Sequence, residues 1–446
     1  MPGIVTRHFR IHNAEQFQEA FGESAATNMY LYIARVSAWD DDNDPPTPSD
    51  SVQEIDYNSW KKMLAAKKVQ TSDVTFAVPR YDWTSGKIYR EYDNTSATLH
   101  ATPASANGLY VISSSYNVYK CLFNNKAATS TVEPTGTSTS TLVTADGYHW
   151  KYMYTVDAAN ALKFLSTNWQ PIKTLAADDG SGQWDVQAAA ANGAINIIDV
   201  NAVGDNYLTN TGTLAAVANS TTMTLAAGAS GSDDIYTGSS LYIASGLGSG
   251  QVSNITNYVG STKVLTLGSA LSITPNTSST YSVGPTVTIT GDGTGATAYA
   301  NVVSGGANGN TVNYINMVSV GAGYSEATVA ITANTSHGSG ATATAYVAPP
   351  GGHGSDPVQE LAGHNVIVNV QLDGDESGTF MTTNDFRTIG LIRDPLLANG
   401  SIATGTSFDQ TTQITVSSVT SSGAYTLDET ITGGTSGATG KLVSFA

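Results

Sequence analysis

Cysteine is almost absent from this sequence of 446 residues, because Cys121 is its only one. A lone cysteine cannot form an intrachain disulfide, which agrees with folding in a reducing cytoplasm. Long apolar runs are missing as well. The N-terminal segment, MPGIVTRHFRIHNAEQF, has no signal-peptide core, and no later stretch approaches a membrane-spanning length. We therefore expect a protein made in a cytoplasm, with no membrane insertion.

Positive charge is scarce. Lysine and arginine together number 19 against 36 aspartates and glutamates, which gives a formal net charge of −17. This balance argues against an electrostatic footprint for nucleic acid or for an anionic membrane. An acidic surface favours solubility and is compatible with a partner that presents a basic patch. The charge thus excludes classes of partner without selecting one.

What the sequence has in abundance is glycine, at 44 residues, with serine, threonine and alanine crowding the second half. Such a composition is typical of short strands and tight turns, and the length suggests several domains. We expect a mainly β fold with a few helices, in which Gly/Thr-rich β modules are inserted into and appended to an α+β body. The predicted domains are 1–175 (first part of the body), 176–350 (β repeats, with an inserted module at about 208–283), 351–410 (returning part of the body) and 411–446 (a C-terminal β-rich unit).

A corner near the N-terminus organises the first domain. An apolar strand, residues 30–36, leads into an acidic, proline-rich segment, residues 40–48, whose prolines stiffen the chain. Ser51 and Glu54 have the spacing of a capping box, which predicts a helix starting there. The residues at helical spacing behind that cap are Val52, Ile55, Trp60 and Leu64.

Further elements are predicted along the body from caps and apolar alternation. Asn13 is the expected cap of a helix over residues 14–25, and Asp157 that of a helix over 158–165. The expected strands are 74–78, 87–92 (returning from a turn at 83–86), 109–113, 117–123, 150–156 and 366–372. Aromatic residues are frequent here, and most are expected in the core or in cross-strand pairs: Tyr30, Tyr32, Trp39, Trp60, Tyr81, Trp83, Tyr89, Tyr92, Trp150, Tyr152 and Tyr154.

A repeat is visible in the glycine-rich half. Residues 198–207 (IDVNAVGDNY) align with 315–324 (INMVSVGAGY), and 286–302 with 328–347. The two halves are nearly adjacent in the second copy but are separated by residues 208–283 in the first. We therefore interpret this segment as an insertion in a loop of the first copy. Its predicted strands are 222–225, 240–244, 251–259 and 263–267, and residues 349–356 (PPGGHGSD) are interpreted as a linker.

Several long strings in one order carry a resemblance to a known family. They are the corner at 30–63, DVTFAVPRYDWTSGKIYREY at 73–92, YNVYKCL at 116–122, VEPTGTSTSTLVTADGYHWKYMY at 132–154 and FMTTNDFRTIGLIRDP at 380–395. The chain resembles the baseplate wedge protein, gene product eight in the T-even naming, of contractile-tailed bacteriophages. The resemblance covers most of residues 1–175 and much of 356–410, but not the segments between.

The resemblance implies a structural virion protein and not an enzyme. Proteins of this kind associate as homodimers, bind other baseplate wedge subunits and take part in the rearrangement that triggers sheath contraction. The 176–350 region departs from the family, and possible host-surface contact is one role for it. The alternative function is a tail adhesin or glycan-binding protein acting through its β modules; an enzyme acting on envelope polymers has no support in the sequence.

Candidate sites for chemistry are weak. Asp40, Asp42 and Asp44 have the alternate spacing of an EF-hand loop, but proline replaces the required glycine and Ser51 the bidentate glutamate. The glycine-rich run 291–295 lacks the Lys-Ser/Thr of a P-loop and predicts a repeated turn. His8 and His12 lie in a segment interpreted as strand-like, without further ligands. We therefore predict no catalytic, cofactor-binding or metal residues and no cofactor.

Overall fold

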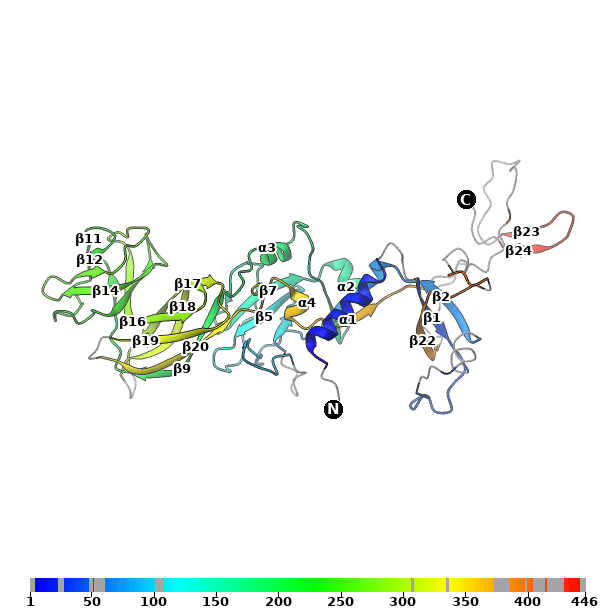
Figure 1. The fold of residues 1–446 in the computed structure, drawn as a ribbon, viewed down its shortest axis with the longest axis horizontal. Coiled ribbons are helices and arrows are strands. Elements are labelled where there is room, and N and C mark those ends of the chain that lie inside the picture. Colours follow the sequence, from blue (N-terminus) through cyan, green and yellow to red (C-terminus); the bar gives the residue numbers. More distant parts are fainter. Residues whose placement is uncertain are drawn as a thin grey trace. The chain divides into compact units, whose positions relative to one another are not determined.

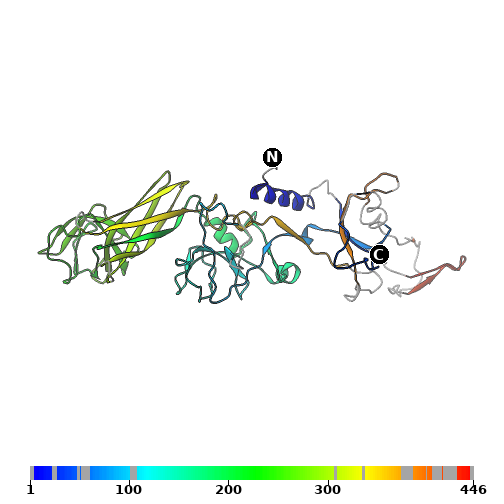
Figure 2. The same ribbon diagram turned by 90° about the horizontal axis from the view of Figure 1, so that it is seen from below.

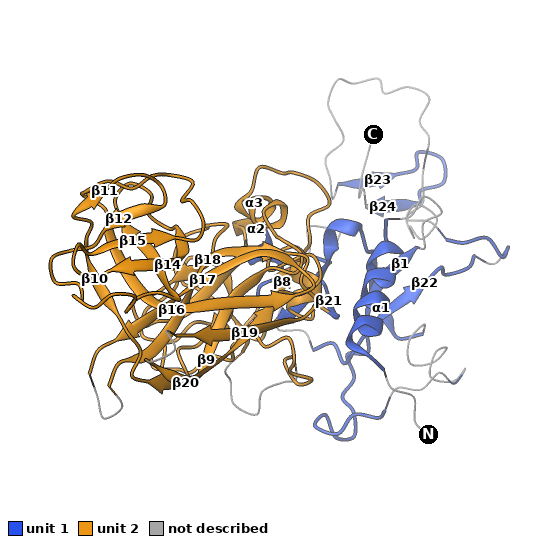
Figure 3. Cartoon of the chain, turned by 60° about the vertical axis from the view of Figure 1, so that its left-hand side comes forward, with its two compact units in different colours: residues 1–78, 160–165, 364–446 blue, residues 79–159, 166–363 orange. Residues whose placement is uncertain are grey.

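The computed structural model describes residues 5–22, 28–47, 51, 61–100, 108–305, 309–333, 337–372, 385–397, 399–403, 414 and 429–441. Strands dominate this part of the chain and only four α-helices occur in it, which confirms the mainly β, multidomain fold (Figure 1). The chain divides into two compact units (Figure 3). Unit 1 comprises residues 1–78, 160–165 and 364–446, and unit 2 comprises residues 79–159 and 166–363.

Unit 1 is built on a three-stranded antiparallel sheet. Its central strand β1 (Met29–Ala34) lies between β2 (Met63–Lys68) and β22 (Thr388–Arg393). The short 3₁₀ turn Thr71–Asp73 precedes β3 (Val74–Pro79), which pairs with β21 (Asn365–Val368). A hairpin of β23 (Thr430–Thr432) and β24 (Thr439–Lys441) completes its described strands. The strand predicted at 30–36 is thus confirmed as β1.

The first helix differs from its prediction. Helix α1 runs over Arg7–Glu19, and Thr6 caps it by accepting a hydrogen bond from the Phe9 N–H. Asn13 therefore lies inside the helix and is not its cap, and the segment between His8 and His12 is helical and not strand-like. Thr6 is the cap because its side-chain oxygen accepts a hydrogen bond from an N–H of the first turn that has no partner within the helix. Phe17 and Phe21 meet edge to face, with ring centroids 5.2 Å apart.

The helix predicted beyond Ser51 lies mostly outside the described residues, as do Glu54 and Trp60. Leu64 is described, and it lies in strand β2 with 48% of its surface exposed. The predicted helical position for Leu64 is therefore wrong. It sits at a register shift, where Ala34 pairs with Met63 while Ile33 pairs with Ala65. Such a bulge leaves one residue unpaired and disturbs the alternation on which a sequence pattern depends.

Unit 2 begins with an antiparallel sheet in the order β4-β5-β7-β6. Its strands are β4 (Tyr110–Ile112), β5 (Asn117–Phe123), β6 (Leu142–Val143) and β7 (His149–Thr155), and helix α3 (Gly182–Ala188) packs near β7. Strand β8 (Trp169–Ile172) and helix α4 (Pro357–Glu360) also belong to this unit, and α2 spans Ala158–Phe164. The strands predicted at 109–113, 117–123 and 150–156 and the helix at 158–165 are thus confirmed.

The predicted hairpin strand at 87–92 is wrong. Gly86 forms the expected turn with φ of 83°, but beyond it only an isolated bridge joins Lys87 to Ser130. The side chain of Tyr89, in the middle of this segment, is buried in the core. Its hydroxyl accepts a hydrogen bond from the Thr84 N–H at 2.6 Å, and its ring packs edge to face against Trp150. The segment is held by these side-chain contacts and by single backbone hydrogen bonds, such as those from the Arg90 N–H to Gly108 and from the Tyr92 N–H to Cys121, instead of by a continuous ladder.

Six long strands form the repeat region. Three antiparallel pairs occur, β9 (Ile195–Asp205) with β20 (Ser339–Val347), β17 (Thr294–Val303) with β18 (Thr311–Ala322), and β16 (Thr280–Gly291) with β19 (Ala327–Thr332). The pairs lie against one another and share one apolar core (Figures 1 and 2). The first strand of each copy therefore pairs with the last strand of the other.

The registers of the two copies agree residue by residue. Ala296 pairs with Val320 as Ala341 pairs with Val203, and the bulges fall at equivalent places in both ladders. Tyr207 and Tyr324, equivalent in sequence, both lie against glycines: an added Cβ would come within 2.4 Å of Tyr207 at Gly338 and of Tyr324 at Gly293. The repeat seen in the sequence thus corresponds to two structural copies, and each copy pairs its first strand with the last strand of the other.

Between the halves of the first copy lies a segment with its own core. Its strands are β10 (Asn210–Thr213), β11 (Ala216–Val217), β12 (Thr222–Thr224), β13 (Ser239–Ser245), β14 (Val252–Val259), β15 (Val264–Leu267) and the start of β16. The four strands predicted here are confirmed. The buried cluster draws only on residues 214–283, and Asn210 pairs with Val283 at the segment's two ends. None of the described helices is long and apolar enough to cross a membrane.

Candidate functional site: returning segments and a buried charged network

Strand β22 returns to the N-terminal part of unit 1 and completes its sheet. Tyr30 pairs with Ile392 and Ile33 with Ile389 across this ladder. The Asp394 carboxylate accepts from the Asn28 N–H at 2.7 Å, which fixes where the returning strand ends. Residues more than 350 positions apart are therefore neighbours, and the sheet requires both ends of the chain.

An ion pair joins the acidic corner to the same returning strand. Arg387 donates from Nε and Nη2 to the two carboxylate oxygens of Asp42, each at 2.9 Å. Hydrogen bonds from Arg387 and from the Trp39 N–H lower the pKa of Asp42 to about 2. Both contacts are solvent-exposed, so their contribution to stability is small. Asp42 thus has a basic partner within the chain. Among the described residues, no cluster of His, Cys, Asp or Glu side chains is suited to bind a metal ion.

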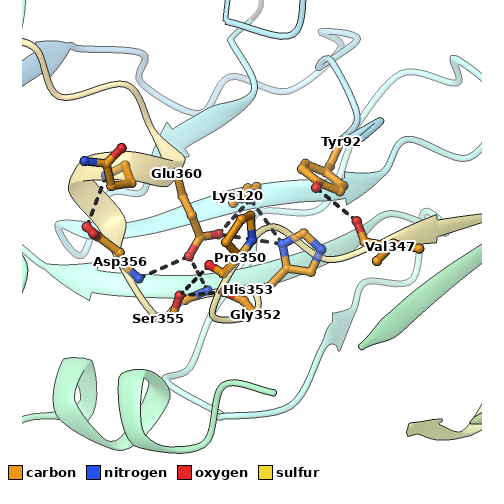
Figure 4. A network of polar contacts seen from close by, with 11 residues as sticks. Tyr92, Lys120, Val347, Pro350, Gly352, His353, Ser355, Asp356 and Glu360 are labelled. Atoms are coloured by element: carbon orange, nitrogen blue, oxygen red, sulfur yellow. Dashed lines mark hydrogen bonds and ion pairs between the residues drawn. The ribbon is translucent and has the colours of Figure 1, made fainter. Parts of the chain in front are cut away.

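A deeply buried charged network lies in unit 2 beneath residues 350–360 (Figure 4). Lys120, on the central strand β5, donates to Oε2 of Glu360 at 2.7 Å, and its Nζ lies 3.1 Å from Nδ1 of His353. All three residues are at most 5% exposed. The Lys120 ammonium also lies 4.4 Å from the centre of the Tyr92 ring, within range of a cation–π contact.

The chemistry of the network follows from burial and charge. Burial and the neighbouring Lys120 charge lower the pKa of His353 to about 4, so the imidazole is neutral and Nδ1 accepts from the ammonium. Burial alone would raise the pKa of Glu360, but the Lys120 charge outweighs it and holds that pKa well below its usual range. Glu360 also accepts from the Gly354 N–H at 2.7 Å through its other oxygen. A hydrogen-bonded network of this kind fixes the position of the chain in the interior.

The network corrects the prediction that 349–356 is a linker. His353 is 4% exposed and its ring meets Tyr92 edge to face at 4.5 Å. Gly352 and Gly354 have φ of 97° and 92°, and an added Cβ at either would collide with neighbours within 2.6 Å. The glycines therefore allow close approach to the body and not flexibility. The histidine between two glycines was the one signal in the sequence for this role.

The other candidate positions are structural. Asp292, in the glycine-rich turn between β16 and β17, accepts from the Ser325 N–H and hydroxyl and from the Glu326 N–H, which confirms a turn at 291–295; the equivalent connection of the second copy lies partly outside the described residues. His12 lies on α1, exposed, 4.0 Å from Glu15. Cys121 is buried, and burial raises the pKa of its thiol well above the ordinary value. The predicted core aromatics are mostly confirmed, with Trp39, Tyr81 and Trp83 half-buried and Trp60 outside the described residues.

Comparison with known proteins found a family match in the N-terminal region. The family Phage-Gp8, described as Bacteriophage T4, Gp8, matches residues 3–132. These residues hold β1 to β5, whose neighbours β21, β22 and β7 come from outside the matched range. No protein among curated sequences matches the chain. The similarity at 132–154 and 380–395 stays a prediction, whereas over residues 3–132 the chain is similar to the Gp8 family, that of a phage baseplate wedge protein.

Proposed function

We propose that this protein, a structural component of a phage baseplate, is a wedge subunit that acts as a homodimer. The family match over residues 3–132 carries the proposal. By the same resemblance the subunit binds other wedge proteins and takes part in the rearrangement that starts sheath contraction. Its place is the tail baseplate of the virion, after synthesis in the host cytoplasm, where a lone buried thiol needs no oxidation.

A patch on unit 1 supports self-association. Ile389 and Leu391 alternate along β22 on one face of the sheet, opposite Ile33 and Leu31, and they are 68% and 42% exposed. Adjacent exposed aliphatic side chains on a sheet face are a common feature of protein interfaces. Because β22 is an outer strand of its described sheet, a second copy can approach it around a twofold axis.

The experiment compares the solution mass of three forms of the full chain by light scattering at about 20 µM. The unaltered chain is expected to be a dimer, and Ile389→Asp with Leu391→Asp to be a monomer, since burying two carboxylates in an interface is costly. Leu162→Asp, at a side chain 92% exposed in the same unit, is the matched control and should remain dimeric. A monomeric unaltered chain, together with separate copies in a density map of the assembled baseplate, would contradict the proposal.

A further inference from the structure

A cavity of about 750 Å³ opens in unit 2 along the junction of β9 and β18. The two strands lie against each other without a hydrogen-bonded ladder between them. Body segments around Phe123–Lys126, Thr139–Thr141 and Gly147–His149 contribute the other walls. This volume lies in the range of small-molecule sites, which is about 300–1,000 Å³. The network at Lys120 is a separate feature, although His353 reaches the cavity wall.

The strands contribute equivalent residues to this cavity from the two repeat copies. Asn196 corresponds to Asn313 in the aligned repeats, and Asp199 to Asn316; all four line the cavity. Asn196 is the extra residue of a bulge, since Ile195 and Ile197 pair with the consecutive residues Val347 and Tyr346. Asn313 occupies the equivalent bulge in β18. Bulges redirect side chains, and here they place one amide from each copy at the same opening.

Several polar side chains that line the cavity can form further hydrogen bonds. Among the described residues, the side chains of Asn196, Asn313 and Asn316 make no hydrogen bond, and the buried Oδ1 of Asp199 has no partner. A buried oxygen without a donor carries a desolvation cost that a bound hydroxyl would remove. Tyr314, 44% exposed, adds an aromatic ring to the same wall.

We propose that this cavity binds a neutral oligosaccharide. Each amide both donates and accepts, as vicinal hydroxyls require, the Asp199 carboxylate accepts, and the Tyr314 ring can cover the apolar face of a sugar. An anionic ligand fits less well, because Asp199 would repel it and both lysines of the lining are engaged: Lys151 donates to the Thr139 carbonyl, and the charge of Lys126 acts on Asp199 itself. This proposal does not depend on the wedge role.

Saturation-transfer NMR on the full chain tests the site, with maltohexaose and chitohexaose as the neutral probes. An array of neutral bacterial-surface oligosaccharides extends the search. We expect transfer to at least one sugar, and binding about tenfold weaker or lost in the variant Asn196→Ala with Asn313→Ala, since each removes a bidentate partner. Asn201→Ala is the matched control: it is also a bulge asparagine of β9, but its Nδ2 donates to Thr344 and it does not line the cavity.

Three outcomes would overturn the proposal. The first is the absence of transfer from every neutral sugar. The second is equal binding by the double variant, which would place the sugar elsewhere. The third is saturation transfer to a short cationic peptide and to none of the sugars, which would make the cavity a protein-docking site. Circular dichroism and thermal melting of the variants establish that a loss of binding is not a loss of folding.

Discussion

Burying a charged lysine or glutamate costs free energy unless the two charges pair. In this protein Lys120 and Glu360 pair although they are 240 positions apart in the sequence. Replacing Lys120 by methionine should therefore destabilise the fold by about 3–5 kcal/mol, because Glu360 is left charged and unpaired in the interior. The double variant Lys120→Met with Glu360→Leu should recover most of that loss. Urea unfolding of the two variants and the unaltered chain measures both free energies. Equal destabilisation by the single and double variants would show that the pair itself is unimportant.

The same network predicts a pH dependence. The folded pKa of His353 is about 4 against an ordinary value of 6.5, so between these values the unfolded chain binds a proton that the folded chain does not. The unfolding free energy therefore has its full value above about pH 6.5. It decreases towards pH 4, by on the order of 3 kcal/mol for such a shift. His149, whose pKa burial also lowers to about 4, should contribute similarly. The depressed pKa of Glu360 acts only below its unfolded value of 4.5, and so adds to the loss of stability only at the acid end of this range.

Unfolding in urea at pH 7, 6 and 5 tests this. His353→Gln can still accept from Lys120 but does not titrate, so it should flatten the dependence by about half. The remaining slope should fall further when His149→Gln is added. A slope unchanged by His353→Gln would mean that the imidazole has the same pKa in the folded and the unfolded chain.

At the scale of elements, the body strands were predictable because alternating apolar residues and aromatics mark buried strands within a few residues. Their partners were not. Strand β1 pairs with β22 through contacts that depend on residues at both ends of the chain, and no local pattern encodes them. The same holds for the repeats: the alignment found both copies, but the exchange of strands between them is a property of packing. The buried network failed to be predicted because Lys120, His353 and Glu360 are ordinary residues until the fold joins them.

One glycine tests the pairing of β1 with β22. A Cβ added at Gly390 would lie 2.5 Å from the Tyr32 ring, which covers this position. Gly390→Ala should therefore force the ring or the strand to shift and cost about 1–3 kcal/mol. Hydrogen exchange at the β1 amides should rise with it. Gly440→Ala, at a strand glycine with open space around it, should leave both measurements unchanged. Protection of β1 that survives Gly390→Ala would indicate that the sheet does not depend on this contact.

At the scale of the whole molecule, the domain limits remain a proposal. Deleting the segment 208–283 tests this proposal most directly. The core of this segment is its own, and its ends are paired at Asn210 and Val283, so a short bridge can join them. Removing 208–283 with a Gly/Ser linker should therefore leave a soluble chain that still unfolds cooperatively. Some stability should be lost, because Ser282 bonds to Tyr299 and Ser240 to Thr286 across the boundary.

The deletion also has an internal comparison. In the second repeat copy Tyr324 reaches the next strand through Ser325 and Glu326 alone, so that copy already shows the short connection that the deleted first copy would need. Grafting Ser-Glu in place of 208–284, which reproduces the length of the second copy's connection, should then serve as well as a flexible linker. Differential scanning calorimetry should show one transition fewer, or a smaller total enthalpy, with the remaining transition near its original temperature. Aggregation of both deletion variants would instead make the segment part of the core that folds the repeats.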